Sequence, residues 1–228
     1  MHMLDVQIIP ALTDNYIFHL ATNQQNIVID PGTAQPVFNT LGDQPLHTIL
    51  ITHHHHDHIG GVSELKKAYN CNVIAYPNPT DAPATLDIAD QQVDVLHTPG
   101  HTSDHLSFYW PGEQVLFCGD TLFTGGCGRL LSGTAEQMFN SLQQIAQLPA
   151  DTKVYSAHEY TVANYRFAAH YAPENPIYQE RLAWAEAQRA QNQPTVPTTI
   201  AEERRSNIFL QTTSVAEFIA IRQAKDRF

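Results

Sequence analysis

The segment TILITHHHHDHIGG, residues 48–61, decides the fold of this chain. Its first four residues are β-branched or apolar and predict a strand, and its two glycines precede a helical pattern over residues 62–69. Four consecutive histidines, an aspartate and a fifth histidine lie between the two patterns. Imidazole is the commonest side-chain metal ligand, and no packing role requires the aspartate or the glycines. The segment therefore predicts a metal site where a strand ends.

Alternation along an extended chain divides these side chains between two ions. His53 and His55 point to the same side and can bind one ion. The chain then turns and offers Asp57 and His58 to a second ion. Two histidines remain as bystanders, His54 and His56. A purification tag or a metal-free histidine cluster would also produce such a run, but a tag is normally terminal and this run is internal.

Length and composition are those of a globular protein. The chain has 228 residues, of which 43% are apolar, and it fits one generous domain or one domain with a smaller appendage. No apolar run is long enough to cross a bilayer, so we expect a soluble protein. Residues 1–6 lack the basic and apolar segments of an export signal, which makes the cytoplasm the expected location.

Cysteine and charge content narrow the range of partners. The three cysteines lack C-x-x-C spacing, which predicts reduced thiols and argues against both disulfides and a cysteine zinc cluster. They are Cys71, Cys118 and Cys127. Twelve basic and 23 acidic residues give a net charge of −11, which disfavours a nucleic-acid backbone as partner. We expect a monomer without a nucleic-acid or membrane partner.

Strand-like and helix-like segments alternate through the first 160 residues, which predicts an α/β protein with helices covering its sheets. Strands are expected at 7–9, 16–18, 26–29, 48–51, 72–75, 93–96, 106–110, 114–118 and 153–156, and helices at 36–41, 62–69 and 134–148. From about Thr161 onward we expect no strand, only helices such as 176–191 and 214–226. The chain is therefore divided into a first domain, 1–160, and a smaller helical domain, 161–228.

Three further metal ligands are expected at the ends of predicted strands, where active sites of α/β folds gather. They are His101, Asp120 and His158. A lone histidine or aspartate at a strand end is more often a cap or a satisfied polar group than a metal ligand. Together with the histidine run they give seven ligands: His53, His55 and His101 on one ion, Asp57, His58 and His158 on the other, and Asp120 as a bridge. Such a bridge would keep the ions roughly 3.5–4 Å apart, as in two-metal hydrolytic sites.

Four motifs in this order, T-H-x-H-x-D-H, T-P-G-H-T, G-D-T-L-F and A-H-E-Y-T, resemble the metallo-β-lactamase superfamily over residues 14–160. The resemblance implies an αββα sandwich with a dinuclear metal site between the sheet edges. His54 and His56 fall at variable positions of the first motif. Superfamily members cleave lactams, thioesters, lactones and phosphodiesters, so the fold does not select a substrate.

The last helical segment, 214–226, carries two basic residues of interest. Three of its apolar side chains share one face, and at 100° per residue Arg222 and Lys225 fall on or beside that face. The alternative is that both cations suit the negative end of the helix dipole. The residues alone do not decide between these two roles.

The C-terminal pattern R-x-x-K-D-x-F resembles the ending of the glyoxalase II, or hydroxyacylglutathione hydrolase, family. Four other stretches carry the resemblance over the full length: 14–16, 126–129, 173–176 and 207–210. It implies an α/β metallo-β-lactamase-like catalytic domain and a helical substrate-binding domain. The residues that it assigns to glutathione are Arg129, Tyr160, Arg222 and Lys225.

The resemblance implies a metal-dependent thioesterase that converts S-(2-hydroxyacyl)glutathione, with S-lactoylglutathione first, to glutathione and a 2-hydroxy acid. This is the second step of methylglyoxal detoxification. The expected cofactors are two divalent ions, zinc first and iron or manganese as alternatives. Asp57 and Asp120 are the expected catalytic residues, and they orient a hydroxide that bridges the ions.

The chain departs from the family pattern at a few positions. Leu131 and Ser132 replace a frequent aromatic residue and glutamate, Asp104 replaces a usual glycine, and 207–211 replaces N-P-F-L-R. These departures concern substrate affinity and local packing, and none removes a metal ligand. The rival functions are a lactonase, a nuclease, a persulfide dioxygenase, a β-lactamase and a non-catalytic metal-binding protein. The basic tail argues against the first three. The cytoplasmic character and His58 argue against a β-lactamase, and a non-catalytic protein would leave the seven ligands and the basic tail without a purpose.

Overall fold

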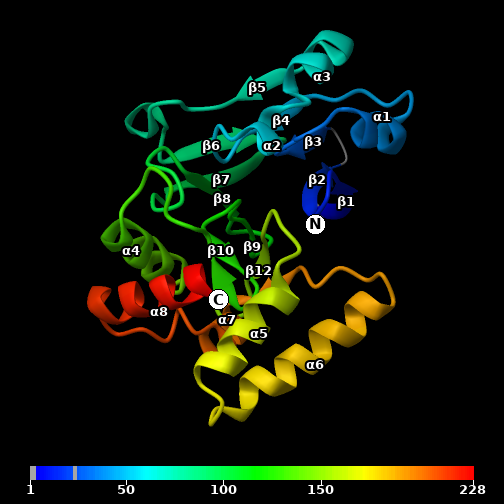
Figure 1. The fold of residues 1–228 in the computed structure, drawn as a ribbon. Helices are drawn as coiled ribbons and strands as arrows, with labels where there is room; N and C mark the ends of the chain where they lie inside the picture. The colour runs from blue at the N-terminus through cyan, green and yellow to red at the C-terminus, as the bar shows by residue number, and fades with distance from the viewer. Residues whose placement is uncertain (1–3, 23–24) are drawn as a thin grey trace.

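Two β-sheets lie face to face in the middle of this computed structural model, which describes residues 4–22 and 25–228 (Figure 1). The first sheet has the order β1-β2-β3-β4-β5. Its strands are β1 (Asp5–Ala11), β2 (Asn15–Ala21), β3 (Asn26–Ile29), β4 (Thr48–Leu50) and β5 (Asn72–Ile74). β1, β2 and β3 pair antiparallel, whereas β3, β4 and β5 pair in parallel, so the ends of β3 and β4 meet at one edge.

The second sheet has the order β13-β12-β9-β8-β7-β6. Its strands are β6 (Thr85–Ile88), β7 (Gln91–His97), β8 (Leu106–Trp110), β9 (Val115–Phe117), β12 (Lys153–Tyr155) and β13 (Thr198–Thr199). β9 and β12 pair in parallel, so the loops that follow them leave the sheet on the same side. A separate small hairpin joins β10 (Leu122–Phe123) to β11 (Gly126–Cys127).

Helices cover the outer face of each sheet, and α1 and α3 lie at the opposite end of Figure 1 from α4 to α8. The first sheet packs its outer apolar residues against α1 (Gln35–Leu41) and α3 (Val62–Tyr69). The second packs against the remaining long helices. These are α4 (Ala135–Ile145), α5 (Thr161–Tyr171), α6 (Pro176–Ala190), α7 (Ile200–Ser206) and α8 (Val215–Arg227). Two short helices are α2 (His56–Ile59) and the 3-10 turn η1 (Pro79–Asp81).

The core between the sheets is aromatic. Phe117 stacks on Tyr155 with ring centroids 5.1 Å apart, and Phe18 from the first sheet contacts both rings. Burial of three such side chains stabilises the sandwich by several kcal/mol, at roughly 25 cal/mol per Å² of apolar surface. The predicted αββα sandwich is confirmed. No helix among the described residues is long and apolar enough to cross a membrane.

One prediction about the tail is wrong, because β13 lies in the segment where no strand was expected. Its two residues pair antiparallel with Lys153 and Val154 of β12. A two-residue strand has no alternation to detect, and Pro197 immediately before it resembles a loop. The tail therefore adds an edge strand to the second sheet as well as helices.

Glu203 of α7 carries a buried carboxylate that links the tail to the β10–β11 hairpin. Its Oε2 accepts hydrogen bonds from the backbone N–H of Gly125 at 3.0 Å and from Asn207 Nδ2 at 2.7 Å. Burial raises the pKa of Glu203 from its ordinary value of 4.5 to about 7. Ionised Glu203 therefore costs more free energy in the folded protein than in the unfolded chain.

Stability should therefore fall as the pH rises from about 5 to about 8, since the folded protein binds this proton more tightly than the unfolded chain does. The shift from 4.5 to about 7 corresponds to about 3 kcal/mol. Glu203→Gln keeps an oxygen for both hydrogen bonds and is expected to remove this loss. Urea unfolding of both proteins at the two pH values measures it. If the free energies of unfolding of the wild-type protein and of Glu203→Gln differed by the same amount at both pH values, the raised pKa would not belong to Glu203.

Candidate metal centre and substrate cavity

Metal group one consists of three histidines whose ring nitrogens converge: His53, His55 and His101. His55 Nδ1 lies 3.0 Å from His53 Nε2 and 3.0 Å from His101 Nε2. Ligands bound at 2.0–2.1 Å around one tetrahedral ion lie roughly 3.3 Å apart, so the spacing fits a single ion. Because β4 ends at Leu50, His53 and His55 lie in the following loop, not in the strand that alternation requires. They nevertheless point to one place.

Metal group two consists of Asp57, His58 and His158. Asp57 Oδ2 lies 3.5 Å from His58 Nε2 and 3.3 Å from His158 Nε2. The first two residues belong to α2, which the sequence did not reveal, and His158 follows β12. Metal group two therefore combines residues that follow β4 of the first sheet with a residue that follows β12 of the second sheet.

Asp120 lies between the two groups and turns one carboxylate oxygen toward each. Its Oδ2 is 3.3 Å from His101 Nε2 in metal group one. Its Oδ1 is 3.5 Å from His58 Nε2 and 3.4 Å from His158 Nε2 in metal group two. This arrangement is the one that a bridging carboxylate requires.

The residues present fit divalent cations. Two buried polar atoms of these groups, His58 Nε2 and Asp120 Oδ1, have no hydrogen-bond partner among the described residues. Such an unpaired buried atom costs about 1–3 kcal/mol, and a cation bound between them removes that cost. Imidazole and carboxylate together suit zinc, iron or manganese.

Asp30 at the end of β3 orients two of the histidines from behind. Its Oδ2 accepts hydrogen bonds from His58 Nδ1 at 3.0 Å and from Thr52 Oγ1 at 2.6 Å. Thr52 Oγ1 in turn accepts a bond from His53 Nδ1 at 3.1 Å. Each bond keeps the ring proton on Nδ1 and leaves the lone pair of Nε2 free for a cation.

Two other histidines are oriented in the same way. His158 Nδ1 donates to Asp14 Oδ1 at 2.8 Å, and His101 Nδ1 donates to the backbone carbonyl of Arg129 at 2.8 Å. Both rings therefore also present Nε2 to the metal groups. The bond from His101 fixes the backbone of Arg129 beside metal group one.

The backbone of Asp120 is fixed by two neighbours. Its N–H donates to Nε2 of His105 at 3.1 Å, and burial lowers the pKa of His105 to about 3, so this ring stays neutral and accepts. Gly119 before it has φ +46°, and a Cβ at that position would lie 2.5 Å from Thr52 Oγ1. Only glycine allows the chain to pass this close to the ligand loop.

The charges of the two groups favour metal ligation. Burial, followed by the neighbouring charge of His58, lowers the pKa of His53, so its ring is neutral. Burial alone would lower the pKa of His158, but the nearby carboxylates of Asp120 and Asp57 outweigh burial and raise that pKa to about 10. The contact with His158 and the hydrogen bond from Asn15 hold the pKa of Asp57 well below its usual range. A divalent cation takes the place of such protons when it binds.

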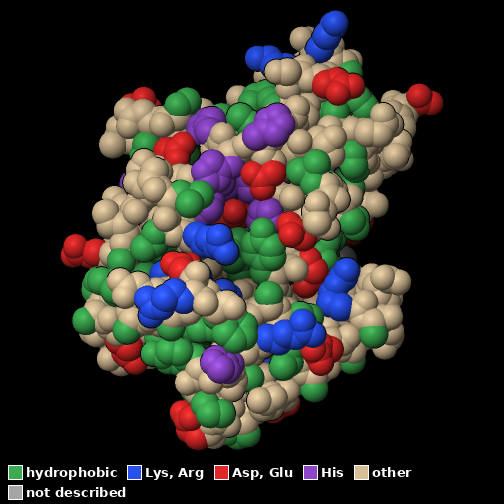
Figure 2. All heavy atoms as spheres, in the orientation of Figure 1, with side chains coloured by type: hydrophobic (Ala, Val, Ile, Leu, Met, Phe, Trp, Pro, Cys, Tyr) green, Lys and Arg blue, Asp and Glu red, His purple; other side chains and the backbone are tan. Residues whose placement is uncertain are grey.

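A cavity of about 540 Å³ extends from the metal groups toward α8. Figure 2 shows histidine and acidic side chains gathered in the middle of one face, with Lys and Arg side chains directly below them. The cavity contains all four residues that the sequence assigned to substrate: Arg129, Tyr160, Arg222 and Lys225. His101 and Asp120 line its other end. One ligand of metal group one, the bridging candidate Asp120 and the four predicted substrate residues therefore line one cavity.

The two cations that α8 contributes to the cavity, Arg222 and Lys225, differ in their contacts. Arg222 is buried and uses its guanidinium within the protein, on Asp226 Oδ1 at 2.7 Å and on the Cys127 carbonyl at 3.1 Å. Lys225 is partly buried, and its Nζ contacts Asn164 Oδ1. Burial, followed by the charge of Arg222, lowers the pKa of Lys225 to about 7. The ammonium pairs with an amide oxygen and not with a carboxylate of the described chain, so it can bind an anion.

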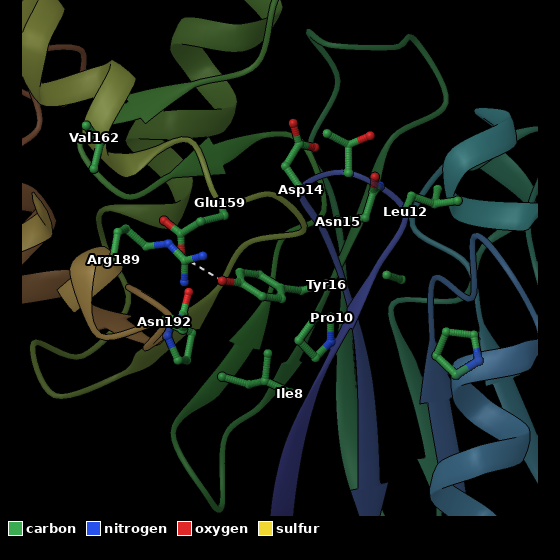
Figure 3. A pocket seen from close by; sticks show the side chains of 14 residues that line it. Ile8, Pro10, Leu12, Asp14, Asn15, Tyr16, Glu159, Val162, Arg189 and Asn192 are labelled. Carbon is green, nitrogen blue, oxygen red and sulfur yellow. Dashed lines mark hydrogen bonds and ion pairs between the residues drawn. The ribbon is translucent and has the colours of Figure 1, made fainter.

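A second cavity, of about 760 Å³, lies between the β1–β2 turn and the tail (Figure 3). There Tyr16 donates to Glu159 Oε2 at 2.6 Å, and Arg189 lies 3.8 Å from the same oxygen. Asn15, which also lines it, donates to Asp57 Oδ2 at 3.0 Å. None of the seven predicted metal ligands lines this cavity, so the smaller cavity is the candidate site.

Several residues that orient the ligands were missed from sequence. Asp30 follows a predicted strand in the D-P-G turn, and Asp14 begins the D-N-Y stretch. A carboxylate next to a predicted strand was therefore the feature of the sequence that could have indicated each of them. His105 follows the T-P-G-H-T motif by three residues. Only the fold shows that each of these side chains faces a ligand.

The αββα sandwich and the paired His/Asp groups at its strand ends define a metal-binding protein of the metallo-β-lactamase class. The family model described as Metallo-beta-lactamase superfamily matches residues 15–92 and 78–158, and the model described as Hydroxyacylglutathione hydrolase C-terminus matches residues 159–228. The chain belongs to the hydroxyacylglutathione hydrolase family.

Individual relatives support this assignment. A hydroxyacylglutathione hydrolase of Haemophilus ducreyi is 44% identical over 99% of this chain and 100% of its own length. One of Tolumonas auensis is 46% identical over 95% of this chain and 90% of its own. Among solved structures, ETHE1 from Myxococcus xanthus is 24% identical, covers 97% of this chain and 90% of its own, and has a TM-score of 0.72. That likeness concerns the fold.

Proposed function

We propose that this chain hydrolyses S-(2-hydroxyacyl)glutathione to glutathione and a 2-hydroxy acid, with S-lactoylglutathione as the first candidate substrate. One observation carries the proposal: a single cavity has His101 and Asp120 at one end and Lys225 at the other. A thioester of glutathione needs both ends, since its reacting carbonyl must meet the metal groups while its carboxylates meet cations. The names of the relatives support the same substrate.

Two divalent ions, zinc first and iron or manganese as alternatives, would supply a water of lowered pKa and a positive centre for the developing oxyanion. The protein's own groups do the rest. Asp57 and Asp120 orient the attacking water by accepting hydrogen bonds from it, since both carboxylates are ionised and face the metal groups. Asp120 is held for this role through its N–H bond to His105.

The glutathione part is assigned to the far end of the cavity. Lys225 binds one carboxylate, and Arg129 and Tyr160 line the path between it and the metal groups. Tyr160 stacks on His158 with ring centroids 4.8 Å apart, which aligns its ring with the ligand. Arg222 contributes positive charge and holds the Cys127 backbone in place.

The biological setting follows from this activity. We assign the protein to the cytoplasm as a monomer that acts on a small molecule, without a nucleic-acid or membrane partner, in the second step of methylglyoxal detoxification. The catalytic domain is 1–160 and the substrate-binding domain is 161–228. Support for this division comes from the two family matches, which meet at residues 158 and 159.

Release of free thiol from S-lactoylglutathione tests the proposal. We expect turnover that a chelator abolishes and that added zinc, iron or manganese restores. Oxygen uptake with glutathione persulfide is the control, because a persulfide dioxygenase would consume oxygen and this protein should not. Absence of chelator-sensitive thiol release would refute the proposal.

A further inference from the structure

A histidine that is not in either metal group contacts the opposite loop of the site. His54 Nδ1 donates to Asp104 Oδ2 at 2.8 Å, and the two residues are 50 positions apart in the chain. Both side chains are partly buried, with exposed fractions of 34% and 22%. The contact therefore joins two separate loops beside the metal centre.

In the sequence, each partner stands between two residues that build the site. His54 stands between the ligands His53 and His55. Asp104 stands between the ligand His101 and His105, the residue that fixes the backbone of Asp120. All three ligands of metal group one thus come from the two loops that this contact joins.

Other hydrogen bonds also hold the loop around Asp104. At its base the backbone N–H of Leu106 donates to the carbonyl of Thr52, which precedes the histidine run, at 2.8 Å. The backbone N–H of Ser103 donates to Ser132 Oγ at 3.1 Å, and the carbonyl of Ser103 faces His97 Nε2 at 3.2 Å. Both contacts tie the loop to the second half of the site, not to the histidine run. Apart from the ligand nitrogens of His55 and His101, which lie 3.0 Å apart, the bond from His54 to Asp104 gives the histidine run a side-chain link to this loop.

Neither His54 nor Asp104 belongs to the groups of His and Asp that could hold a metal ion among the described residues. The contact between them is therefore separate from the predicted ligand set.

We propose that His54 and Asp104 are a positioning pair that sets the spacing of metal group one before the metal arrives. Ligands already in place lose less conformational freedom on binding, so the pair raises metal affinity. Partners that orient ligands directly change affinity by about 10- to 100-fold. His54 and Asp104 do not contact the ligand side chains directly and act through the backbone of the loops. We therefore expect an effect on metal affinity at the lower end of that range, about 10-fold.

Competition with a chromogenic chelator for zinc tests the pair in the full-length protein. Asp57→Ala serves as the background, because it weakens metal group two and leaves metal group one to be measured. In this background Asp104→Gly and His54→Ala should each weaken zinc binding about 10-fold. Asp104→Asn should restore most of the affinity, since its oxygen still accepts the bond from His54.

The double variant separates a joint role from two independent roles. If the residues act as a pair, His54→Ala with Asp104→Gly should weaken zinc binding no more than either single change. His56→Ala is the matched control, because this exposed histidine of the same run should leave affinity unchanged.

Unchanged zinc affinity in both single variants would overturn the inference, as would additive losses in the double variant. A loss of metal-free folding stability with unchanged affinity would do so too, because it would assign the contact a purely structural role. The inference rests on the proposed metal site. It does not depend on the thioester, so failure here and failure of the thiol-release assay are distinguishable.

Discussion

Asp120→Ala is expected to lower kcat/KM for the thioester by about 10³-fold and to reduce the bound metal below two ions per chain. Removal of one preorganised group that stabilises the reacting charges costs about 10²–10³. Asp120 also contacts both metal groups, through different oxygens. Elemental analysis of the purified protein and steady-state thiol release measure the two effects.

Two further variants make the result specific. Asp57→Ala removes a half-exposed carboxylate that contacts metal group two only, so it should lose one ion and keep the other. Asp87→Ala removes an exposed carboxylate on the edge strand β6 and should keep both ions and full activity. If Asp120→Ala retained two ions per chain and wild-type turnover, Asp120 would not be the bridge. Full activity and unchanged metal content in Asp57→Ala would exclude its assigned role.

Lys225→Met is expected to raise KM about 10- to 100-fold with little change in kcat. A hydrogen bond between charged partners contributes about 1.5–3 kcal/mol, and Lys225 is assigned to a carboxylate far from the reacting carbonyl. Methionine keeps an apolar stem and removes the ammonium, whose Nζ lies 5.7 Å from the centre of the Phe167 ring. Initial rates across a range of S-lactoylglutathione concentrations give both constants.

The pH dependence gives the same residue a second test. The pKa of Lys225 is lowered to about 7, so the ammonium is present below that pH and is lost as the pH rises through it. The wild-type kcat/KM, which reports the free enzyme, should therefore decline above about pH 7 from loss of binding. Lys225→Met should lack this decline, and the exposed control Arg227→Ala should keep it. A decline of the same size in Lys225→Met would show that another group causes it.

Much of the metal centre could be predicted because its ligands follow strands with clear apolar patterns. The predicted strands at 26–29 and 106–110 and the helix at 62–69 agree with β3, β8 and α3 at both ends. Parallel strands end at one edge of a sheet, so the positions of the ligands after predicted strands were enough to group residues far apart in the sequence.

What could not be predicted depends on contacts between distant segments. The two-residue strand β13 forms only because β12 offers a free edge. Asp30 becomes a partner of His58 only when β3 and β4 lie side by side. His54 looked like a bystander, because nothing in its own segment indicates that Asp104 lies 2.8 Å away.

The division of ligands between the sheets has a mechanical consequence. Residues after β4 of the first sheet share metal group one with His101, which follows β7 of the second sheet, and metal group two with His158, which follows β12 of the second sheet. Each bound ion would therefore act as a cross-link between the two layers, comparable to a reversible disulfide. At a free concentration 1,000 times its Kd, one such ion adds about 4 kcal/mol to the free energy of unfolding. Metal binding and the packing of the two sheets then stabilise each other. A substitution at Phe18 or Phe117 that moves the sheets apart should therefore also weaken metal binding.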